Sequence, residues 1–235
     1  MKKIIVGVLL TGIVVSLTSS SYATKNKVKP FVDLEMFLPG NVSDGTEADM
    51  KDGAQAIVNS GADSVSYKIE TTAALGARVG VLFPVEFGDA GVSVGYIAGP
   101  NSKTEMNINS TLVGNAGVNI DRKLTFIRVL GEFKKDMPIN DNWTFKPSVG
   151  LGIAFGQSKE TVTSATAYLA SMAGDSYSKS WSGFTWEISP TFTRKYTTVD
   201  LNLAVKYAGF PKLKANDNVS KIDWSTLGFS IGLGF

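Results

Sequence analysis

The sequence contains no histidine and no cysteine among its 235 residues. Without cysteine, disulfides, thiolate chemistry and cysteine-based metal sites are excluded. Without histidine, the commonest general base and the commonest metal ligand are missing, so Ser–His and Asp–His mechanisms are excluded as well. We therefore expect a protein that is not an enzyme, with no catalytic residue, no metal site and no cofactor.

Charge and long apolar runs are also scarce. Charged residues make up 19% of the chain and the formal net charge is +2, whereas soluble domains carry about 25% charged residues. This balance predicts no nucleic-acid partner and no strongly anionic one. After the first residues, no segment supplies the roughly 18 consecutive apolar residues of a spanning helix, so a helical membrane protein is not expected.

The N-terminus has the pattern of an export signal. Lys2 and Lys3 precede an apolar stretch over residues 4–17, and Ser21-Tyr22-Ala23 places small residues where a signal peptidase cuts. The alternative is an uncleaved anchor, but the stretch is shorter than the about 20 residues that a spanning helix needs. The sequence predicts a signal peptide over residues 1–23 and a single β-barrel domain over residues 24–235.

Beyond the signal, hydrophobicity alternates with a period of two, which is typical of strands. In residues 143–155 one face is bulky and apolar while the other carries Thr, Lys, Ser, Gly and Ala. Eight segments follow this pattern, and their lengths suit tilted transmembrane strands of about 9–11 residues better than soluble strands of about 5–6. The predicted strands are 30–38, 73–83, 90–98, 124–134, 143–155, 184–192, 199–207 and 227–235.

The connections between these segments alternate in length. Residues 39–72, 99–123, 157–180 and 209–224 form long connections, and residues 84–89, 135–142 and 194–197 form short ones. Long loops on one side and short turns on the other are typical of outer-membrane barrels, with the short turns in the periplasm. Ten strands are an alternative, because residues 64–70 or 102–113 could form an extra hairpin.

The two faces of the strands indicate which one meets lipid. An eight-stranded barrel has an interior just wide enough for side chains, which suits the Gly, Ser, Ala, Thr and charged face. The bulky Leu, Phe and Trp face suits lipid, and its aromatics fall at two levels, as bilayer interfaces favour. The predicted fold class is all-β: a closed antiparallel transmembrane β-barrel, most simply of eight strands.

The signal ending at Ala23, the eight alternating segments and the final run Leu227-Gly-Phe-Ser-Ile-Gly-Leu-Gly-Phe235 carry a resemblance. The chain resembles the small outer-membrane barrels related to the transmembrane domain of outer-membrane protein A and to the opacity proteins. This resemblance implies a place in the bacterial outer membrane, with its lipid and lipopolysaccharide as surroundings. It also implies the barrel-assembly machinery as a partner, with an assembly signal formed by Phe229, Ile231, Leu233 and Phe235.

Charged residues on the inward face are the candidate site. Their signs are mixed, and buried charges are tolerated only when paired, so we interpret them as an ion-pair network that fills the lumen. The alternative interpretation is a proton or ion path, or a gate whose pairs exchange partners. The predicted lumen-facing residues are Asp33, Glu35, Arg78, Arg128, Glu132, Lys146, Glu187, Asp200 and Lys206.

Three functions compete at this point. The first is a structural or adhesive surface protein whose outer loops bind host or envelope partners, since loops on a rigid scaffold are where binding usually resides. The second is a small porin-like channel for ions or small solutes, or a lateral exit for small apolar molecules. The third is a soluble, secreted β-barrel that binds a ligand inside.

Overall fold

The computed structural model describes residues 28–112, 114–213 and 222–235. The predicted signal peptide, residues 1–23, lies outside these ranges and stays a prediction. In chain order the elements are β1 (Lys29–Phe37), α2 (Asn41–Asn59), β2 (Ser64–Thr71), β3 (Ala74–Val85), β4 (Gly88–Asn109), β5 (Ala116–Lys134), β6 (Met137–Pro138), β7 (Trp143–Ala165), η1 (Ala167–Met172), β8 (Ser176–Lys195), β9 (Asp200–Leu213) and β10 (Ile222–Gly234).

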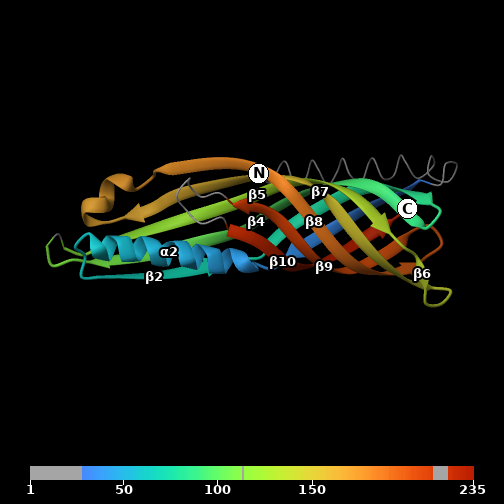
Figure 1. Cartoon of the computed structure of the whole chain (residues 1–235), viewed down its shortest axis with the longest axis horizontal. Helices are drawn as coiled ribbons and strands as arrows, with labels where there is room; N and C mark the ends of the chain where they lie inside the picture. Colours follow the sequence, from blue (N-terminus) through green and yellow to red (C-terminus); the bar gives the residue numbers. More distant parts are fainter. Residues whose placement is uncertain (1–27, 113, 214–221) are drawn as a thin grey trace.

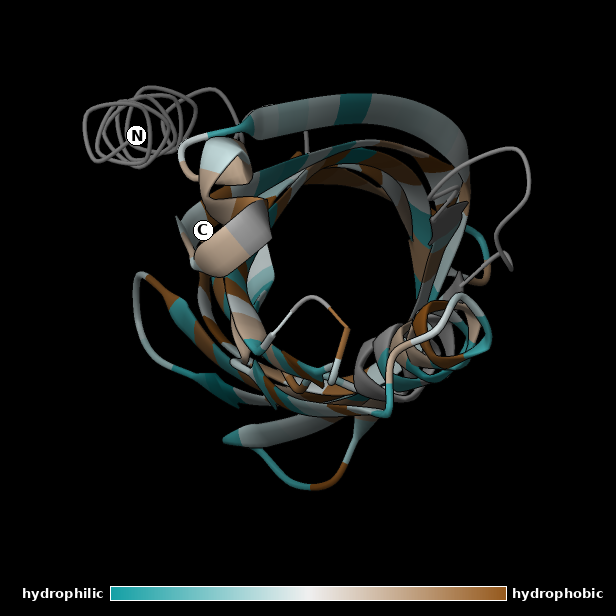
Figure 2. Ribbon diagram, turned by 90° about the vertical axis from the view of Figure 1, so that its left-hand side faces the viewer, coloured by the Kyte–Doolittle hydropathy of each residue, from teal (hydrophilic) through white to brown (hydrophobic). Residues whose placement is uncertain are grey.

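Eight of the strands close into a ring. The order is β1-β3-β4-β5-β7-β8-β9-β10, and β10 pairs again with β1. Every pair is antiparallel, and the view along the barrel in Figure 2 shows the closed ring. Closure leaves no open sheet edge in this part, which a lipid environment requires. The predicted eight-stranded antiparallel barrel is confirmed.

The ten-stranded alternative is wrong for the ring itself. Strand β2 covers residues 64–71 and pairs with residues 102–109 of β4, outside the ring, and the two-residue β6 pairs only with β7. Short turns join β3 to β4 and β8 to β9 at the end of the barrel where β1 begins and β10 ends. We call this the periplasmic end and the opposite one the outer end (Figure 1).

All eight predicted segments lie in strands to within one residue at their ends, but four of the strands run much farther than predicted. β4, β5, β7 and β8 have 22, 19, 23 and 20 residues, about twice what a tilted strand needs to cross a bilayer. Most of the residues expected as loops in 39–72, 99–123 and 157–180 therefore form strands and a helix. The period-two pattern is weaker there because neither face of this part meets lipid.

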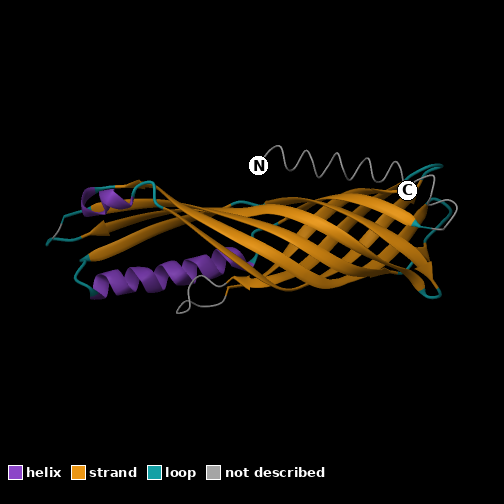
Figure 3. Ribbon diagram, turned by 90° about the horizontal axis from the view of Figure 1, so that it is seen from above, coloured by secondary structure: helices purple, strands orange, loops and turns teal. Residues whose placement is uncertain are grey.

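These outer strand ends form a second structural unit, which we call the extension. It comprises β2, the outer halves of β4, β5, β7 and β8, and α2, which lies beside them (Figure 3). Met106, Ile108, Val118 and Val162 are its buried core, and Met50 and Ile57 of α2 pack against them. The extension thus folds around apolar contacts of its own, beyond the end of the barrel.

Helix α2 begins where the chain leaves the barrel wall. Gly40 precedes it with a φ of 55°, a left-handed conformation that glycine adopts without strain. A Cβ on Gly40 would also collide with the carbonyl oxygen of Ser225 on β10. Within the described ranges, no helix is both long and apolar enough to cross a membrane.

The outward face of the ring is an apolar belt. Leu151, Phe155 and Phe184 are 59%, 53% and 61% exposed, although side chains of this kind are normally buried. Exposed apolar surface that continues around a whole barrel marks a membrane interface. Exposed aromatics lie toward both ends of the belt, with Phe155, Phe184, Tyr207 and Phe229 at the outer end and Phe83, Phe133 and Phe192 at the periplasmic end.

The belt generates a stability prediction. Leu151 faces outward in the middle of the apolar run of β7, so replacing it with arginine places a charge near the bilayer midplane. We expect Leu151→Arg to lower the free energy of unfolding in lipid vesicles by about 2–4 kcal/mol. Asn119→Arg, at an exposed position of the extension, is the control and is expected to change it little. Equal effects of the two substitutions in urea titrations would contradict the belt.

Candidate functional site in the barrel lumen

Strand parity brings charged side chains into the lumen from five strands. Alternate residues of a strand share a face, so Asp33 and Glu35 of β1 point inward together, as do Arg128 and Glu132 of β5. Arg78 of β3 lies directly opposite Asp33 in the β1–β3 register. Glu187 of β8 and Lys206 of β9 complete the set, and all seven residues are buried.

Glycines separate like charges around the ring. Gly95 pairs with Arg78 on one side and with Arg128 on the other. A Cβ on Gly95 would lie 3.4 Å from the Arg128 side chain. In the same way, Gly150 stands between Glu132 and Glu187. Each glycine leaves room for two long side chains of one sign to turn toward partners across the lumen.

Arg78 is the centre of the network. Its guanidinium lies 2.6 Å from Asp33 Oδ2 and 2.9 Å from Glu187 Oε1. It also lies 3.1 Å from Glu132 Oε1 and 3.2 Å from Glu35 Oε1. One arginine therefore contacts four carboxylates from three strands, which suits a planar group with five N–H donors.

Two further cations share the same carboxylates. Arg128 lies 2.7 Å from an oxygen of Glu35 and 2.7 Å from one of Glu187. Lys206 Nζ donates to Glu35 Oε1 at 2.5 Å and lies 3.4 Å from Glu187. Because each carboxylate serves more than one cation, the removal of one cation leaves several buried carboxylates with fewer partners.

A fourth cation completes the charge balance. Lys134 Nζ lies 3.2 Å from Glu132 Oε2, and the hydroxyl of Ser93 donates to the other oxygen of Glu132. With Lys134, four cations face the four carboxylates of Asp33, Glu35, Glu132 and Glu187. Neutrality is what allows so many ionised groups to lie out of water.

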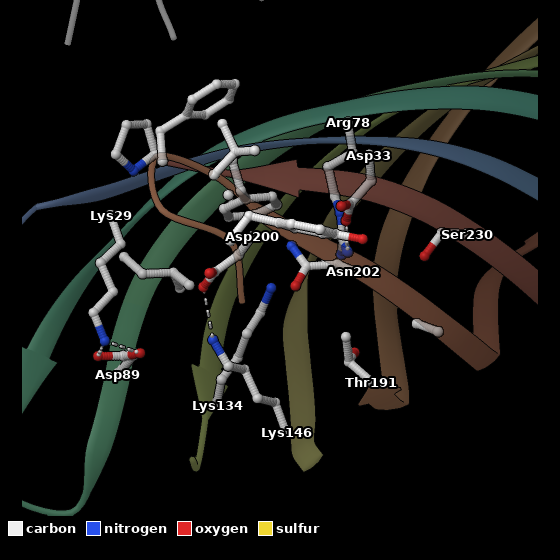
Figure 4. Close-up of a pocket in the computed structure, with 18 of the residues that line it drawn as sticks. Lys29, Asp33, Arg78, Asp89, Lys134, Lys146, Thr191, Asp200, Asn202 and Ser230 are labelled. Atoms are coloured by element: carbon white, nitrogen blue, oxygen red, sulfur yellow. Dashed lines mark hydrogen bonds and ion pairs between the residues drawn. The ribbon is translucent and has the colours of Figure 1, made fainter. Parts of the chain in front are cut away.

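A cavity opens below the network at the periplasmic end. Its volume is about 320 Å³, and Asp33 and Arg78 form its inner wall. At its mouth Lys29 Nζ donates to Asp89 at 2.7–2.8 Å. Lys146 lies 3.8 Å from Asp200 (Figure 4). The cavity is a polar vestibule that ends at the network.

Above the network, toward the outer end, the lumen is filled by aromatic rings. Phe210 and Trp224 stack with centroids 4.0 Å apart, and Phe126 lies 5.0 Å from Trp224. Phe37 meets Phe210 edge-on at 5.6 Å, and the Arg128 guanidinium lies 5.2 Å from the Phe37 ring. We call Phe37, Phe126, Phe210, Trp224 and the adjoining Trp181 the aromatic plug.

The aromatic plug corrects one expectation. The alternating sequence pattern predicts bulky aromatics toward lipid and small or charged residues in the lumen, yet Phe37, Phe126 and Trp224 are 0–1% exposed inside the barrel. The alternation along the strands would have predicted these inward aromatics, because Phe37 shares its face of β1 with Asp33 and Glu35. Phe126 likewise shares its face with Arg128.

The nine predicted lumen residues fall into two groups. Seven of them, Asp33, Glu35, Arg78, Arg128, Glu132, Glu187 and Lys206, form one connected network. Lys146 and Asp200 lie apart from it, at the mouth of the vestibule. Sequence reasoning missed Lys134, although it lies on the same face of β5 as Glu132.

The predicted assembly signal lies on the outside of the barrel. Phe229, Ile231 and Leu233 of β10 are exposed to the lipid side. The backbone N–H of Phe235 donates to the carbonyl oxygen of Pro30, so the last residue is tied to β1. The signalling role itself stays a prediction. Within the described ranges, no group of three or more acidic residues is placed to hold a metal ion.

The network generates a prediction about coupled stability. Removing Arg128 leaves Glu35 and Glu187 with fewer cations in a buried site, so Arg128→Met is expected to lower the free energy of unfolding by about 3–5 kcal/mol. Adding Glu35→Gln restores the charge balance and is expected to recover part of that loss. Urea unfolding of the refolded protein measures both.

The matched control is Lys195→Met, which removes an exposed cation and is expected to cost no more than about 1 kcal/mol. If Arg128→Met unfolds at the same urea concentration as this control, the buried network does not hold the barrel together.

No family model and no curated protein matches the sequence. Among solved structures, the chain is similar to Neisserial surface protein A, with 12% identity over 88% of this chain and 95% of that one and a TM-score of 0.43. It is similar to Ail, the attachment invasion locus protein of Yersinia pestis, solved with the heparin analogue sucrose octasulfate. The identity is 10%, the match covers 88% of this chain and 97% of that one, and the TM-score is 0.35. It is also similar to the N-terminal β-barrel domain of Pseudomonas aeruginosa OprF, with 8% identity over 87% of this chain and 97% of that one and a TM-score of 0.35.

The chain is therefore similar to small outer-membrane barrels, as the sequence predicts.

Proposed function

We propose that this chain is a non-enzymatic, integral outer-membrane barrel that acts at the cell surface through its extension, which binds host or envelope partners. The observation that carries this proposal is a contrast between the two halves of the molecule. Two levels of the lumen, the charged network and the aromatic plug, are filled by side chains, while four strands continue beyond the apolar belt and fold with α2 into a structured unit.

The filled lumen favours a structural role for the barrel over the role of a channel for solutes. A solute that entered the vestibule would meet Arg78 with its four carboxylates, and behind them the stacked Phe210 and Trp224. Crossing the first layer requires separating buried ion pairs, and crossing the second requires displacing packed rings. Both the ion-pair network and the aromatic plug therefore argue against the porin-like alternative.

The construction of the extension supports a binding role. Strands β4 and β7 hold it rigidly on the barrel, and its buried core includes residues of the strands and is covered by α2. Its outward face is polar, with Lys68, Glu105 and Asn107 exposed along neighbouring strands. Binding residues are commonly carried on segments that a rigid scaffold positions in this way.

The apolar belt argues against the third function, a soluble secreted barrel. Rows of exposed Leu, Ile and Phe around the ring would drive aggregation in water. Inside the barrel, the charged network and the aromatic plug adjoin directly, since the Arg128 guanidinium lies 5.2 Å from the Phe37 ring.

A barrel-only variant tests the proposal. Residues 41–71, 104–120 and 160–177 are replaced by short Gly/Asn turns, which removes the extension and leaves the ring, the network and the aromatic plug. Because the ring closes on its own pairings, we expect this variant to refold and to show heat-modifiable migration on a gel. A deletion strain that carries it is expected to lose adhesion to host cells, whereas the full chain restores adhesion.

A strain with Asn119→Arg serves as the control for surface change without loss of the extension. If the barrel-only variant restores adhesion and envelope integrity as well as the full chain, or if the deletion strain has no defect in either, the extension is not the functional part.

A further inference from the structure

A groove runs across the outer wall of the barrel near the outer end. Its volume is about 840 Å³, and side chains from β3, β4, β5, β7 and β8 line it. Its lining includes outward-facing side chains of these strands, together with Phe126 and Trp181 of the aromatic plug, which lie between them along β5 and β8. The lining residues used below are Val94, Tyr96, Ile127, Phe155, Gln157 and Ser180.

The groove is wide compared with a single two-chain lipid. It crosses five neighbouring strands of the ring, and strands lie about 4.8 Å apart, so it extends over about 19 Å. Val94 and Phe155 are 50% and 53% exposed, so their apolar surface is open to the lipid side. The size and polarity of the groove suit a lipid with several acyl chains.

Cross-strand pairs above the groove become steadily more polar toward the outer end. Ile127 lies opposite Phe155, the next outward pair is Thr125 with Gln157, and the next is Lys123 with Lys159. At about 3.3 Å per residue and a tilt of about 45°, Lys159 stands about 9 Å farther along the membrane normal than Phe155. The order apolar, hydrogen-bonding and cationic matches the order of acyl chain, sugar and phosphate in a glycolipid.

The lysine pair lacks a counter-charge. Like charges directly opposite each other on a sheet are destabilising, yet Lys123 and Lys159 are exposed on the same face and face each other. Neither is within ion-pair distance of a carboxylate of the described residues, whose ion pairs include Arg122 with Glu160. The nearest acidic residue on this face, Asp121, lies one pair farther out and faces Lys103.

Two other lysines of the extension, Lys68 and Lys103, have acidic neighbours. The hydrogen bond between Lys68 and Glu70, at 2.8 Å, raises the pKa of the lysine and lowers the pKa of the glutamate. Lys103 has Glu70 on one neighbouring strand and Asp121 on the other. The unmatched pair therefore stands where the belt ends, at the level of the outer-leaflet headgroups.

We propose that the groove and the lysine pair together bind one molecule of the phosphorylated, multiply acylated glycolipid of the outer leaflet, the lipid A part of lipopolysaccharide. Acyl chains lie along Val94, Ile127 and Phe155. Hydroxyl and amide groups of Thr125, Gln157 and Ser180 face the sugar, and a phosphate lies between the two ammonium groups. The assignment rests on the outer-membrane location of the proposed function.

The test is retention of lipid A by the full chain, refolded in detergent and detected by native mass spectrometry. Bisphosphorylated, hexa-acylated lipid A is the probe, and its dephosphorylated form and phosphatidylglycerol are the comparisons. We expect Lys123→Gln/Lys159→Gln to weaken lipid A binding about tenfold or more, because hydrogen bonds to charged groups are lost. Lys123→Arg/Lys159→Arg is expected to restore it.

Lys135→Gln/Lys195→Gln removes two exposed cations at the periplasmic end and is the matched control, expected to bind like the parent. Unchanged binding in Lys123→Gln/Lys159→Gln, or equal binding of all three lipids by the parent, would overturn the assignment. Lipid binding is compared only among variants that show the heat-modifiable gel migration of a folded barrel. The barrel-only variant keeps both lysines, so a failure here is distinct from a failure of the extension to mediate adhesion.

Discussion

The burial of charge in a narrow ring is the constraint on which the rest of the structure depends. Eight strands leave an interior that side chains fill, so a charge that points inward finds its partner there or stays unpaired. Arg78 pairs with four carboxylates, and Lys134 makes the charged network neutral by adding its fourth cation. Gly95 and Gly150 keep like charges apart, so the small residues of the lumen belong to the same solution.

Because the lumen is closed by side chains, the surfaces available for binding lie on the outer wall of the barrel and on the extension. The network and the aromatic plug occupy successive levels of the lumen, so the barrel serves to hold other parts in place. Its outer wall contacts lipid through the apolar belt, and its long strands carry the extension beyond the bilayer. The cationic pair Lys123 and Lys159 stands where the two regions meet, and both the lipid site and the adhesive surface use the rigidity of the same strands.

The sequence predicts the fold well because one period governs it. Strand number, closure and the inward position of Asp33, Glu35 and Arg78 follow from alternation and parity. The aromatic plug escaped prediction, because Phe126 and Trp224 are apolar residues inside a barrel whose apolar face otherwise meets lipid. Of the extension, the sequence indicates residues 64–70 and 102–113 as candidate extra strands, and residues 64–71 pair with residues 102–109 as β2 and the outer half of β4. The helix α2 was not predicted, since it packs against segments far apart in the chain, which local patterns do not reveal.

The most direct test of a sealed lumen is single-channel conductance of the refolded full chain in a planar bilayer, with folding verified by heat-modifiable migration. The account predicts a folded barrel that gives no steady conductance steps. Steady, protein-dependent steps that change when Lys206 is replaced by glutamine would contradict it, because ions would then be passing through the network that is said to close the barrel.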